Sequence, residues 1–575
     1  MINIEVNGKT VQAEAGEMLL TALDRAGIEV PTLCNMEGLP PTGACRMCVC
    51  EVEGQRTLVP ACAFPIFDGM KVKTHSQRVL KARRTILELL LANHPTDCFY
   101  CERNGSCQLQ SLSVELGIRS HRFTGEKDNH PIDESGPAIV RDSSKCILCG
   151  RCVRVCENIQ SVSCLDYIRR GSKAFIGNAF NEGMNISSCI NCGQCVAACP
   201  TGALTAKNDI AKVVAALNDP NLHVVIQHAP AVSVSLGEEF NLPLGVDVMG
   251  TLHAALRKIG FDAVFDTSFA ADLTIMEEAT ELVHRVTNNG VLPMFTSCSP
   301  GWIKFVETFY PEMMPHLSTC KSPQGMLGAV IKSCYAEKIG IEPKKIYSVS
   351  IMPCTAKKFE ASRPELGRDG YQDIDAVLTT REAAQLFKMF GIDLAKLEPE
   401  GADSPFGERS TAGKLFGASG GVMEAAVRTA YKLISGEDLK ELKIEALRGL
   451  EGWGKEAHLD INGLKVGVAV VNSLANARKI IELIKKGELK DIQFVEVMSC
   501  PGGCINGGGQ PYGATAERVT ARMQKLYNLD ATESLRLSHE NKELRRLYDE
   551  YLGKPNSEKA HHLLHTHYNQ RNPLT

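Results

Sequence analysis

One cysteine motif occurs twice in this chain, and the repeat narrows its possible folds more than any other stretch does. The copies are Cys146-x2-Cys149-x2-Cys152-x3-Cys156 and Cys189-x2-Cys192-x2-Cys195-x3-Cys199. Close, repeated clusters of cysteine in a large chain without a signal peptide indicate metal binding, whereas secreted chains use cysteine for disulfides. Residues 1–8 have the pattern of a strand and a turn and do not resemble a signal peptide. The sequence therefore predicts that the thiolates of both copies bind metal.

Length and charge narrow the class of protein further. With 575 residues, the chain is long enough for several domains of roughly 100 to 200 residues each. Its formal net charge is −4, from 63 basic and 67 acidic residues, whereas a nucleic-acid-binding protein usually has a strong basic excess. No apolar run reaches the length of a membrane span. We therefore expect a cytoplasmic protein whose partners include neither nucleic acid nor a membrane.

Residues 1–79 have the pattern of a small α+β domain. Residues 2–6 alternate apolar and polar side chains, Asn7-Gly8 is a strong hairpin turn, and the next five residues can return as a second strand. A helix is expected over residues 19–26, whose leucines and last alanine share one face. The metal-ligand candidates of this segment are Cys34, Cys45, Cys48 and Cys62, and Cys50 is left over.

The spacing of these four cysteines, Cys-x10-Cys-x2-Cys-x13-Cys, resembles the 2Fe-2S ferredoxin domain that begins hydrogenases and the large subunits of NADH and formate dehydrogenases. This resemblance implies a β-grasp domain that holds one 2Fe-2S cluster. Plant-type ferredoxins have the shorter spacing Cys-x4-Cys-x2-Cys, but the dehydrogenase-type group shares the longer first gap. A zinc site is the alternative.

Residues 80–125 carry one histidine and three cysteines at ligand spacing, namely His94, Cys98, Cys101 and Cys107. One imidazole and three thiolates would by themselves favour zinc. Directly after a 2Fe-2S domain, however, His-x3-Cys-x2-Cys-x5-Cys resembles the histidine-ligated 4Fe-4S module of the same families, which implies a small helical domain. A neutral imidazole in place of a thiolate makes the cluster less negative and should raise its reduction potential.

Residues 126–208 contain the duplicated motif, which resembles a two-cluster ferredoxin domain. In that pattern the fourth cysteine of each run binds the other cluster. One 4Fe-4S cluster would therefore be bound by Cys146, Cys149, Cys152 and Cys199. The second would be bound by Cys189, Cys192, Cys195 and Cys156, which leaves Cys164 as a buried spare. Together with the two preceding clusters, this segment predicts an electron-transfer wire.

Residues 209–575 alternate short β-rich runs with helical stretches, and we expect an α/β domain. Three of its loops carry unusual residues: 296–302 (Thr-Ser-Cys-Ser-Pro-Gly-Trp), 352–360 (Met-Pro-Cys-Thr-Ala-Lys-Lys-Phe-Glu) and the glycine-rich 497–509. Together they resemble the three signature motifs of FeFe hydrogenases, and the resemblance covers essentially the whole chain. It implies a large two-lobed catalytic domain and the reversible conversion of protons and electrons into H2. The cofactor would be an H-cluster, in which a 4Fe-4S cubane is joined to a diiron azadithiolate unit with CO and cyanide.

The resemblance also assigns residues to the H-cluster. Cys354, Cys500 and Cys504 would bind the cubane, with Cys504 bridging to the diiron unit. Lys357 would donate to a cyanide, a role that suits a compact cation with several donors. The mostly apolar pocket would be formed by Ala229, Pro230, Ala231, Ser322, Pro323, Gln324, Met352, Pro353, Phe416, Gly417 and Met498. The family often has serine where this chain has Ala231, so one cyanide contact would be missing.

Cys298 and Ser299 depart from the family pattern, which has two adjacent cysteines, the first a proton relay and the second a cubane ligand. By register, Ser299 takes the ligand position and Cys298 remains the relay. A thiolate is the softer donor, however, and it suits iron better than a hydroxyl oxygen does. Cys298 would then be the ligand and Ser299 the relay. The sequence leaves both assignments open.

A proton path is the last feature that the resemblance implies. Glu278, Glu281 and Arg285 lie at positions i, i+3 and i+7, and therefore on one face of a helix. By composition alone, such a face is usually solvated and joined by ion pairs. In the family, the path would run through Glu278, Ser318, Glu281 and Cys298, with Arg285 at its outer end.

The sequence as a whole therefore predicts an FeFe hydrogenase with one 2Fe-2S cluster, three 4Fe-4S clusters, one of them histidine-ligated, and an H-cluster. Its expected partners are ferredoxin or flavin- and NAD(P)-binding subunits, together with maturation proteins for the diiron unit. An electron-transfer subunit of an NADH-dehydrogenase-like complex is one alternative, but it would need only the first 208 residues. A hydrogen sensor or an iron–sulfur assembly factor is another, and it should lack the relay or Lys357. Cys320 and Cys334 match no cluster motif and are expected in the core.

Overall fold

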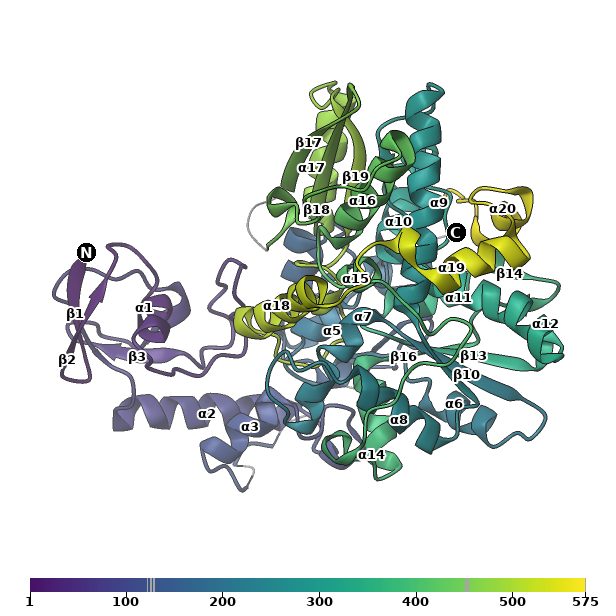
Figure 1. Ribbon diagram of the computed structural model, residues 1–575. Coiled ribbons are helices and arrows are strands. Elements are labelled where there is room, and N and C mark those ends of the chain that lie inside the picture. Colours follow the sequence, from purple (N-terminus) through teal and green to yellow (C-terminus); the bar gives the residue numbers. More distant parts are fainter. Residues whose placement is uncertain (121, 125–126, 128–129, 450–453, 574–575) are drawn as a thin grey trace. The chain divides into compact units, whose positions relative to one another are not determined.

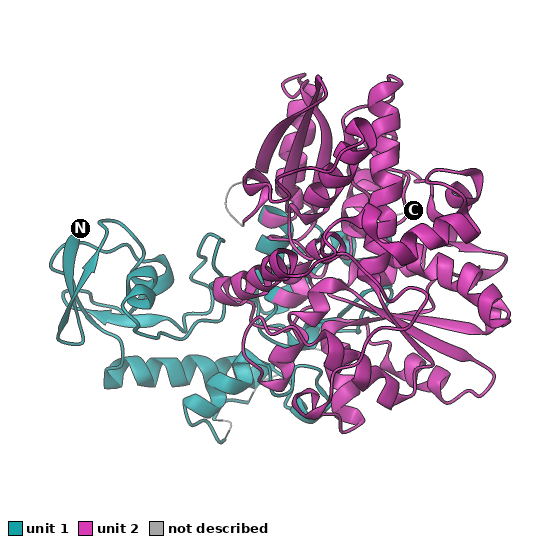
Figure 2. Ribbon diagram, viewed as in Figure 1, with its two compact units in different colours: residues 1–158, 163–187, 198–205 teal, residues 159–162, 188–197, 206–575 magenta. Residues whose placement is uncertain are grey.

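The computed structural model describes the whole chain except residues 121, 125–126, 128–129, 450–453 and 574–575, and Figure 1 shows its helices and strands. The chain divides into two compact units. Unit 1 comprises Met1–Asn158, Ser163–Ser187 and Ala198–Thr205, and unit 2 comprises Ile159–Val162, Ser188–Ala197 and Ala206–Thr575 (Figure 2). Within the described part of the chain, no helix combines the length and the apolar character that crossing a membrane requires.

Unit 1 begins with a five-stranded sheet in the order β2-β1-β5-β3-β4. Its strands are β1 (Ile2–Val6), β2 (Lys9–Ala13), β3 (Val49–Val52), β4 (Val59–Pro60) and β5 (Lys71–Lys73). Strands β1 and β2 form the expected antiparallel hairpin, because Asn7 and Gly8 take φ angles of 52° and 83°, as a two-residue hairpin turn requires. Helix α1 (Leu19–Arg25) buries Leu19, Leu20 and Leu23 in the core of this sheet.

Short elements make up the rest of unit 1. Helix α2 (Gln77–Asn93) begins at Ser76, whose hydroxyl oxygen accepts a hydrogen bond of 3.3 Å from the Val79 amide. The other elements are α3 (Gln108–Glu115), α4 (Arg151–Arg154), and the strand pairs β6 (Ile139–Arg141) with β9 (Leu204–Ala206) and β7 (Asp166–Ile168) with β8 (Phe175–Gly177). The stretches that carry most of the cysteines therefore lie in loops between short elements.

Unit 2 contains a four-stranded parallel sheet in the order β11-β10-β13-β16. Its strands are β10 (His223–His228), β11 (Ala263–Asp266), β13 (Ile346–Met352) and β16 (Ala376–Thr379). Successive side chains of β10 point to opposite faces, so Val224 and Ile226 join one hydrophobic cluster and Val225 joins another. The first cluster includes helices α6 (Ile210–Leu217), α8 (Met249–Ile259) and α14 (Thr380–Met389), and the second includes α9 (Thr267–Thr287), α11 (Pro323–Val330), α19 (Lys542–Leu547) and α20 (Glu558–Leu564). Helices thus cover both faces.

A second sheet of unit 2 has the order β12-β19-β18-β17. Its strands are β12 (Met294–Phe295), β17 (Gly454–Ile461), β18 (Leu464–Asn472) and β19 (Ile492–Met498), of which only β17 runs antiparallel to its neighbour. Helices α9 and α16 (Gly421–Ser435) share a buried cluster with it. The remaining helices are α5 (Gln194–Ala198), α7 (Pro230–Ser233), α10 (Pro300–Phe309), α12 (Ala336–Ile339), α13 (Ala356–Ala361), α15 (Thr411–Leu415), α17 (Leu474–Lys485) and α18 (Ala516–Thr532).

Four strands of the two sheets end directly before the loops that carry unusual residues. Strand β10 is followed by residues 229–231, β12 by 296–299, β13 by 353–354 and β19 by 499–504. Within each sheet these strands run parallel, so their carboxyl ends lie at one edge, which is where α/β folds place binding sites. The fold therefore brings together loops that are far apart in the sequence.

Candidate functional site

One cavity of unit 2 is lined by residues from all four of these loops. Its empty volume is about 830 Å³. Cys298, Ser299, Cys354, Cys500 and Cys504 line it. The wall also includes these residues of the predicted pocket: Ala229, Pro230, Ala231, Pro323, Gln324, Met352, Pro353, Phe416, Gly417 and Met498. The cavity thus combines several thiols with mostly apolar walls.

The three predicted cubane ligands are thiols without disulfide partners. Burial raises the pKa of Cys354 and Cys500, and it raises the pKa of Cys504 to about 12, with the charge of Cys354 as a further cause. Iron binds the thiolate form, not the thiol. A metal cluster in this space would supply the positive charge that three neighbouring thiolates need. The donor set therefore fits a soft, iron–sulfur type of group.

A buried carboxylate, Glu360, holds the polar residues at the cavity. Its Oε2 atom accepts hydrogen bonds from Lys357 Nζ at 2.8 Å, Gln324 Nε2 at 2.9 Å and Ser322 Oγ at 2.8 Å. Lys357 Nζ also donates to the carbonyl oxygen of Cys298 at 3.2 Å. Glu360 is the last residue of the second motif, and the sequence analysis assigned it no function. Its position three residues after Lys357 on a helix was the available signal.

The glycines of the 497–509 loop allow close contact between protein backbones. A Cβ atom at Gly507 would lie 2.1 Å from the carbonyl oxygen of Pro353, and one at Gly508 would lie 2.3 Å from that of Cys192. Both separations are far inside van der Waals contact. Gly507 therefore lets the loop that bears Cys500 and Cys504 pack against the loop that bears Cys354, and Gly508 lets it pack against the backbone at Cys192.

The predicted proton-path residues lie along α9 and the strand-end loops beside it. Ser318 Oγ donates to Glu281 Oε2 at 2.8 Å, and Arg285 Nη2 forms an ion pair with Glu281 Oε1 at 2.6 Å. Glu278 is fully buried, and neither carboxylate oxygen makes a hydrogen bond within the described chain. Burial and the charge of Glu281 raise the pKa of Glu278 to about 8, and burial and Glu278 raise that of Cys298. The structure therefore places these groups next to one another.

Ser299 and Cys298 have different surroundings. Ser299 Oγ lies 2.8 Å from Ser499 Oγ, in the loop that leads to Cys500. Burial raises the pKa of the Cys298 thiol, and the charges of Glu278 and then Cys504 raise it further. Cys298 thus lines the cavity and is influenced by the charge of Glu278 on α9, whereas Ser299 contacts the cysteine-bearing loop.

In unit 1 the structure gathers the first predicted ligand set. The Cys34 thiol interacts with those of Cys45 and Cys62, and Cys48 interacts with Cys62. The leftover Cys50 lies in β3, where burial raises its pKa to about 11. The four predicted ligands are therefore neighbours, and Cys50 has a separate, buried position.

The second ligand set includes a histidine with an unsatisfied nitrogen. His94 Nδ1 is buried and has no hydrogen-bond partner within the described chain. Burial lowers the pKa of His94 to about 4, so its imidazole is neutral. Buried polar atoms are normally paired, and a neutral imidazole nitrogen without a partner suits a metal ligand. Cys98 and Cys101 are half-buried, and Cys107 is buried.

The duplicated motif is divided between the two units. Cys146, Cys149, Cys152 and Cys199 line one cavity of unit 1, with an empty volume of about 420 Å³. Cys156 also belongs to unit 1, whereas Cys189, Cys192 and Cys195 belong to unit 2. The predicted spare, Cys164, is buried, and its thiol donates to Ser187 Oγ at 3.4 Å.

Comparison with known families matches nearly the whole chain. Residues 222–508 match the iron only hydrogenase large subunit, C-terminal domain, and residues 516–571 match the iron hydrogenase small subunit. Residues 1–77 match a 2Fe-2S iron-sulfur cluster binding domain, 83–122 the NADH-ubiquinone oxidoreductase-G iron-sulfur binding region, and 136–205 the ferredoxin-like domain of NADH-quinone oxidoreductase subunit 3.

Three relatives show how far the similarity extends. The chain is 46% identical to the NADP-reducing hydrogenase subunit HndD of Solidesulfovibrio fructosivorans, over 100% of both chains. It is 42% identical to iron hydrogenase 1 of Clostridium pasteurianum, over 99% of this chain and 100% of the relative. It is 33% identical to rat cytosolic iron-sulfur assembly component 3, over 62% of this chain and 76% of that protein.

Solved structures resemble about two thirds of the chain. An apo FeFe-hydrogenase HydA1 variant from Chlamydomonas reinhardtii matches with a TM-score of 0.58 and 43% identity, covering 64% of this chain and all of that one. A HydA structure that records stepwise assembly of the H-cluster matches with a TM-score of 0.56 and 43% identity, covering 63% of this chain and 99% of that one.

Proposed function

Because the chain belongs to the iron-only hydrogenase family, as an oxidoreductase that acts on H2 and carries N-terminal iron–sulfur domains, we propose that its cavity holds an H-cluster. The observation that carries this proposal is the gathering of Cys354, Cys500, Cys504 and Lys357 around one largely apolar cavity. When bound, the H-cluster supplies the electrons and the metal site at which protons and H2 interconvert. The work of the chain is to bind and orient this group, exclude water, and deliver protons and electrons.

Cys354, Cys500 and Cys504 would hold the cubane in this proposal, and Cys504 would also hold the diiron unit. Lys357 would donate to a cyanide, and its hydrogen bonds to Glu360 and to the Cys298 carbonyl oxygen hold the ammonium group in position. Neighbouring apolar residues such as Met352 and Met498 limit access of water. Ala231 has no hydroxyl, so it offers no hydrogen bond at the position where the family often has serine.

The fourth position of the cubane is assigned to Ser299, and Cys298 is assigned to the relay. The contact between Ser299 and Ser499 supports this choice because it draws the Ser299 oxygen toward the cysteine-bearing loop. The influence of Glu278 on Cys298 also supports it, because a relay must neighbour the preceding proton carrier. If Cys298 were the ligand and Ser299 the relay, iron would have the softer thiolate donor, but the Cys298 thiol would no longer be available to take a proton from Glu278.

Protons would travel through Glu281, Ser318 and Glu278 to Cys298, with Arg285 at the outer end. This order differs from the predicted one, in which Glu281 came directly before Cys298, because Arg285 pairs with Glu281 and the charge of Glu278 acts on Cys298. The structure contains the outer contacts of this path: Arg285 forms an ion pair with Glu281, and Ser318 donates a hydrogen bond to Glu281. Arg285 stays charged at all ordinary pH values, so it orients Glu281 and does not itself transfer a proton. Glu278 holds its proton near neutral pH and can pass it on to Cys298.

Electrons would pass through one 2Fe-2S and three 4Fe-4S clusters. The proposed ligands of the 2Fe-2S cluster are Cys34, Cys45, Cys48 and Cys62, and those of the first 4Fe-4S cluster are His94, Cys98, Cys101 and Cys107. The other two 4Fe-4S clusters take the two sets of the duplicated motif, in which the fourth cysteine of each run binds the cluster of the other run. The proposed domains are a β-grasp 2Fe-2S domain at 1–79, a small helical domain at 80–125, a two-cluster ferredoxin domain at 126–208 and a two-lobed catalytic domain at 209–575. The neutral, unpartnered imidazole of His94 supports its role as a ligand.

The proposed partners follow from the relatives. Similarity to an NADP-reducing hydrogenase subunit over the full length supports an electron carrier of the ferredoxin or flavin and NAD(P) type. Maturation proteins would supply the diiron unit, and the proposed location is the cytoplasm. Similarity to an iron–sulfur assembly component covers a smaller share of the chain, and this chain retains Lys357 and the acidic residues of α9.

The test is H2 production from reduced methyl viologen by protein matured with the diiron unit, together with its infrared spectrum in the CO and cyanide region. Activity with those bands supports the proposal. Iron–sulfur absorbance without bands or H2 would overturn it and favour an electron-transfer subunit.

A further inference from the structure

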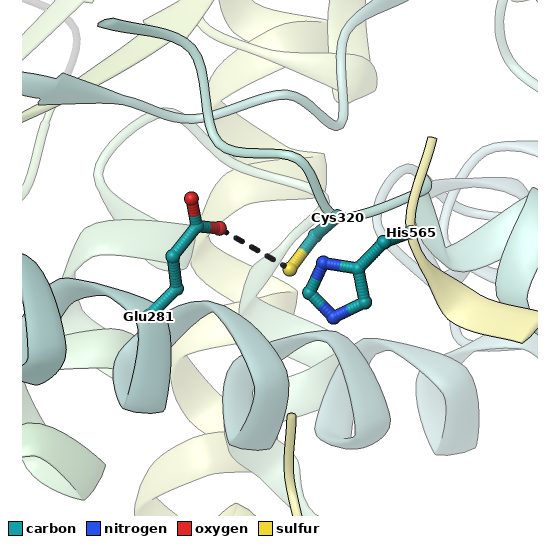
Figure 3. Close-up of side chains that lie close together, drawn as sticks. All are labelled: Glu281, Cys320 and His565. Atoms are coloured by element: carbon teal, nitrogen blue, oxygen red, sulfur yellow. Dashed lines mark hydrogen bonds between the residues drawn. The ribbon is translucent and has the colours of Figure 1, made fainter. Parts of the chain in front are cut away.

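A buried cluster of three different donor side chains lies beside the proposed proton path. It consists of Glu281 on α9, Cys320 in the loop before α11, and His565 directly after α20. One ligand atom of each lies within 4.8 Å of those of the other two. Cys320 and His565 are buried, and the Glu281 side chain is 12% exposed. Figure 3 shows the sulfur of Cys320 between the carboxylate of Glu281 and the ring of His565. Cys320, which the sequence predicted to be core, therefore also contacts a carboxylate.

The three donors match the ligands that zinc prefers. Thiolate, imidazole and carboxylate are its usual protein ligands, and three of them with one open position is a common arrangement. Calcium and magnesium prefer oxygen donors only. Cys320 Sγ lies 3.8 Å from Glu281 Oε2. Two ligands on one tetrahedral zinc ion are separated by roughly 3.5 Å, so this pair needs only a small adjustment.

Hydrogen bonds from a second set of residues orient His565 as they do in metal sites. Its Nδ1 lies 2.8 Å from Thr319 Oγ1, and its Nε2 lies 3.2 Å from Glu277 Oε2. A histidine ligand commonly binds metal through one nitrogen while a carboxylate, carbonyl or water holds the other. Both ring nitrogens have partners, so a metal that binds one nitrogen would replace that contact while the other nitrogen keeps its own.

Charge and access also favour a cation. Glu277 and Glu281 bring two carboxyl groups to neighbouring turns of α9. Arg285 pairs with Oε1 of Glu281, whereas Cys320 contacts Oε2, so a cation would bind the carboxylate oxygen that the guanidinium does not occupy. The exposed His561 stacks on His565 with ring centroids 4.4 Å apart. It supplies a surface imidazole from which a cation could reach the cluster.

We propose that Glu281, Cys320 and His565 form a binding site for a divalent cation of the zinc class, and that occupation of this site inhibits proton transfer. Binding replaces the proton of the Cys320 thiol, which leaves to solvent. The inhibitory part rests on the proposed function, because it requires that protons pass through Glu281. A cation on this carboxylate uses the lone pairs that otherwise accept protons, and its positive charge repels an incoming proton.

The binding test uses full-length protein with its iron–sulfur clusters assembled but without the diiron unit. The probe is Zn²⁺ alone, followed by dialysis, metal analysis and zinc K-edge X-ray absorption. We expect about one retained equivalent with a single sulfur ligand at about 2.3 Å and nitrogen or oxygen ligands at about 2.0 Å. Zinc displaced into an iron–sulfur site would show three or four sulfur ligands and would contradict the proposal.

Two variants and two matched controls localise the site. Cys320→Ser and His565→Gln should each lose the retained zinc. Cys334→Ser removes a half-buried cysteine that packs against the same core cluster, and His562→Gln removes an exposed histidine of α20, so both should retain it. Equal zinc retention in all four variants would overturn the site.

The activity test compares each matured protein with its own zinc-free rate of H2 evolution from reduced methyl viologen. In the wild type and both controls, Zn²⁺ should lower the rate on the order of 10²-fold, reversibly on adding a chelator, because general acid–base transfer contributes this much. The inhibition should be less than about twofold in Cys320→Ser and His565→Gln. Zinc bound with undiminished activity would refute the inhibitory role. An enzyme without H2 activity in any condition would refute the proposed function, but the X-ray absorption result would still decide the metal site.

Discussion

Glu278→Gln tests the proton path at the residue whose surroundings are most unusual. The Glu278 side chain is fully buried, and its carboxylate oxygens have no hydrogen-bond partner within the described residues. Burial, followed by the charge of Glu281, raises its pKa from 4.5 to about 8. One pKa unit corresponds to about 1.4 kcal/mol, so this rise corresponds to roughly 4 to 5 kcal/mol against the charged form. At neutral pH the folded protein therefore holds a neutral carboxylic acid that can pass a proton to Cys298.

The pH dependence of stability follows from this shift. The folded chain keeps the proton up to about pH 8, whereas the unfolded chain releases it near pH 4.5. The stability that protonated Glu278 contributes is therefore complete below about pH 4.5 and is lost as the pH rises to about 8. Glutamine is a neutral mimic that cannot ionise. The variant should therefore become more stable relative to the wild type across this range, by up to roughly 4 kcal/mol.

Infrared difference spectroscopy and H2 evolution measure the two consequences. The carboxyl C=O band of protonated Glu278 should disappear near pH 8 in the wild type, and it should be absent from the variant at every pH. Turnover should fall on the order of 10²-fold or more, because an amide cannot release the proton. Glu488→Gln, an exposed position, is the matched control and should change neither measurement. A carboxyl titration near pH 4.5, or full turnover by a Glu278→Gln enzyme with intact clusters, would refute the reasoning.

Three further substitutions test the site and the fold around it. Glu281→Gln should lower H2 turnover on the order of 10²-fold with unchanged iron content, and full activity would remove the proposed path. Lys357→Met removes the proposed cyanide donor and leaves Glu360 without its ion pair. The matured variant should therefore lose the CO and cyanide infrared bands but keep its iron–sulfur absorbance. Unchanged bands would contradict the role assigned to Lys357. Asp530→Asn breaks a buried ion pair with Arg428 and should lower the free energy of unfolding by about 3 to 5 kcal/mol, measured by anaerobic thermal denaturation. Burial opposes ionisation of Asp530, but Arg428 holds its pKa below 3.8, so wild-type stability should fall as the pH drops below about 4 and the variant should lack this loss.

Much of the fold could be predicted where the signal is local. The Asn7-Gly8 turn predicted the β1–β2 hairpin, because its required φ angles depend on these two residues alone. The i, i+3 and i+7 spacing placed Glu278, Glu281 and Arg285 on one helix face, and α9 contains all three.

Contacts between distant segments could not be predicted in the same way. Glu360 was not recognised as the common acceptor for Lys357, Gln324 and Ser322, because two of these partners lie more than 30 residues away. The contact of Cys320 with Glu281 was also missed, because a lone cysteine outside any motif has the composition of a core residue.

The amino-acid sequence was sufficient to predict iron–sulfur domains in the N-terminal part and the family of the chain, and the comparisons confirm both. Most of the predicted ligands recur at spacings of two or three residues within one motif, so the pattern can be recognised without knowledge of the fold. The tertiary structure alone decided how the cavity is assembled, since Cys298, Cys354 and Cys500 come from loops at the ends of strands in two different sheets. It also decided the protonation of Glu278, because a pKa depends on burial and on neighbouring charges that packing brings together.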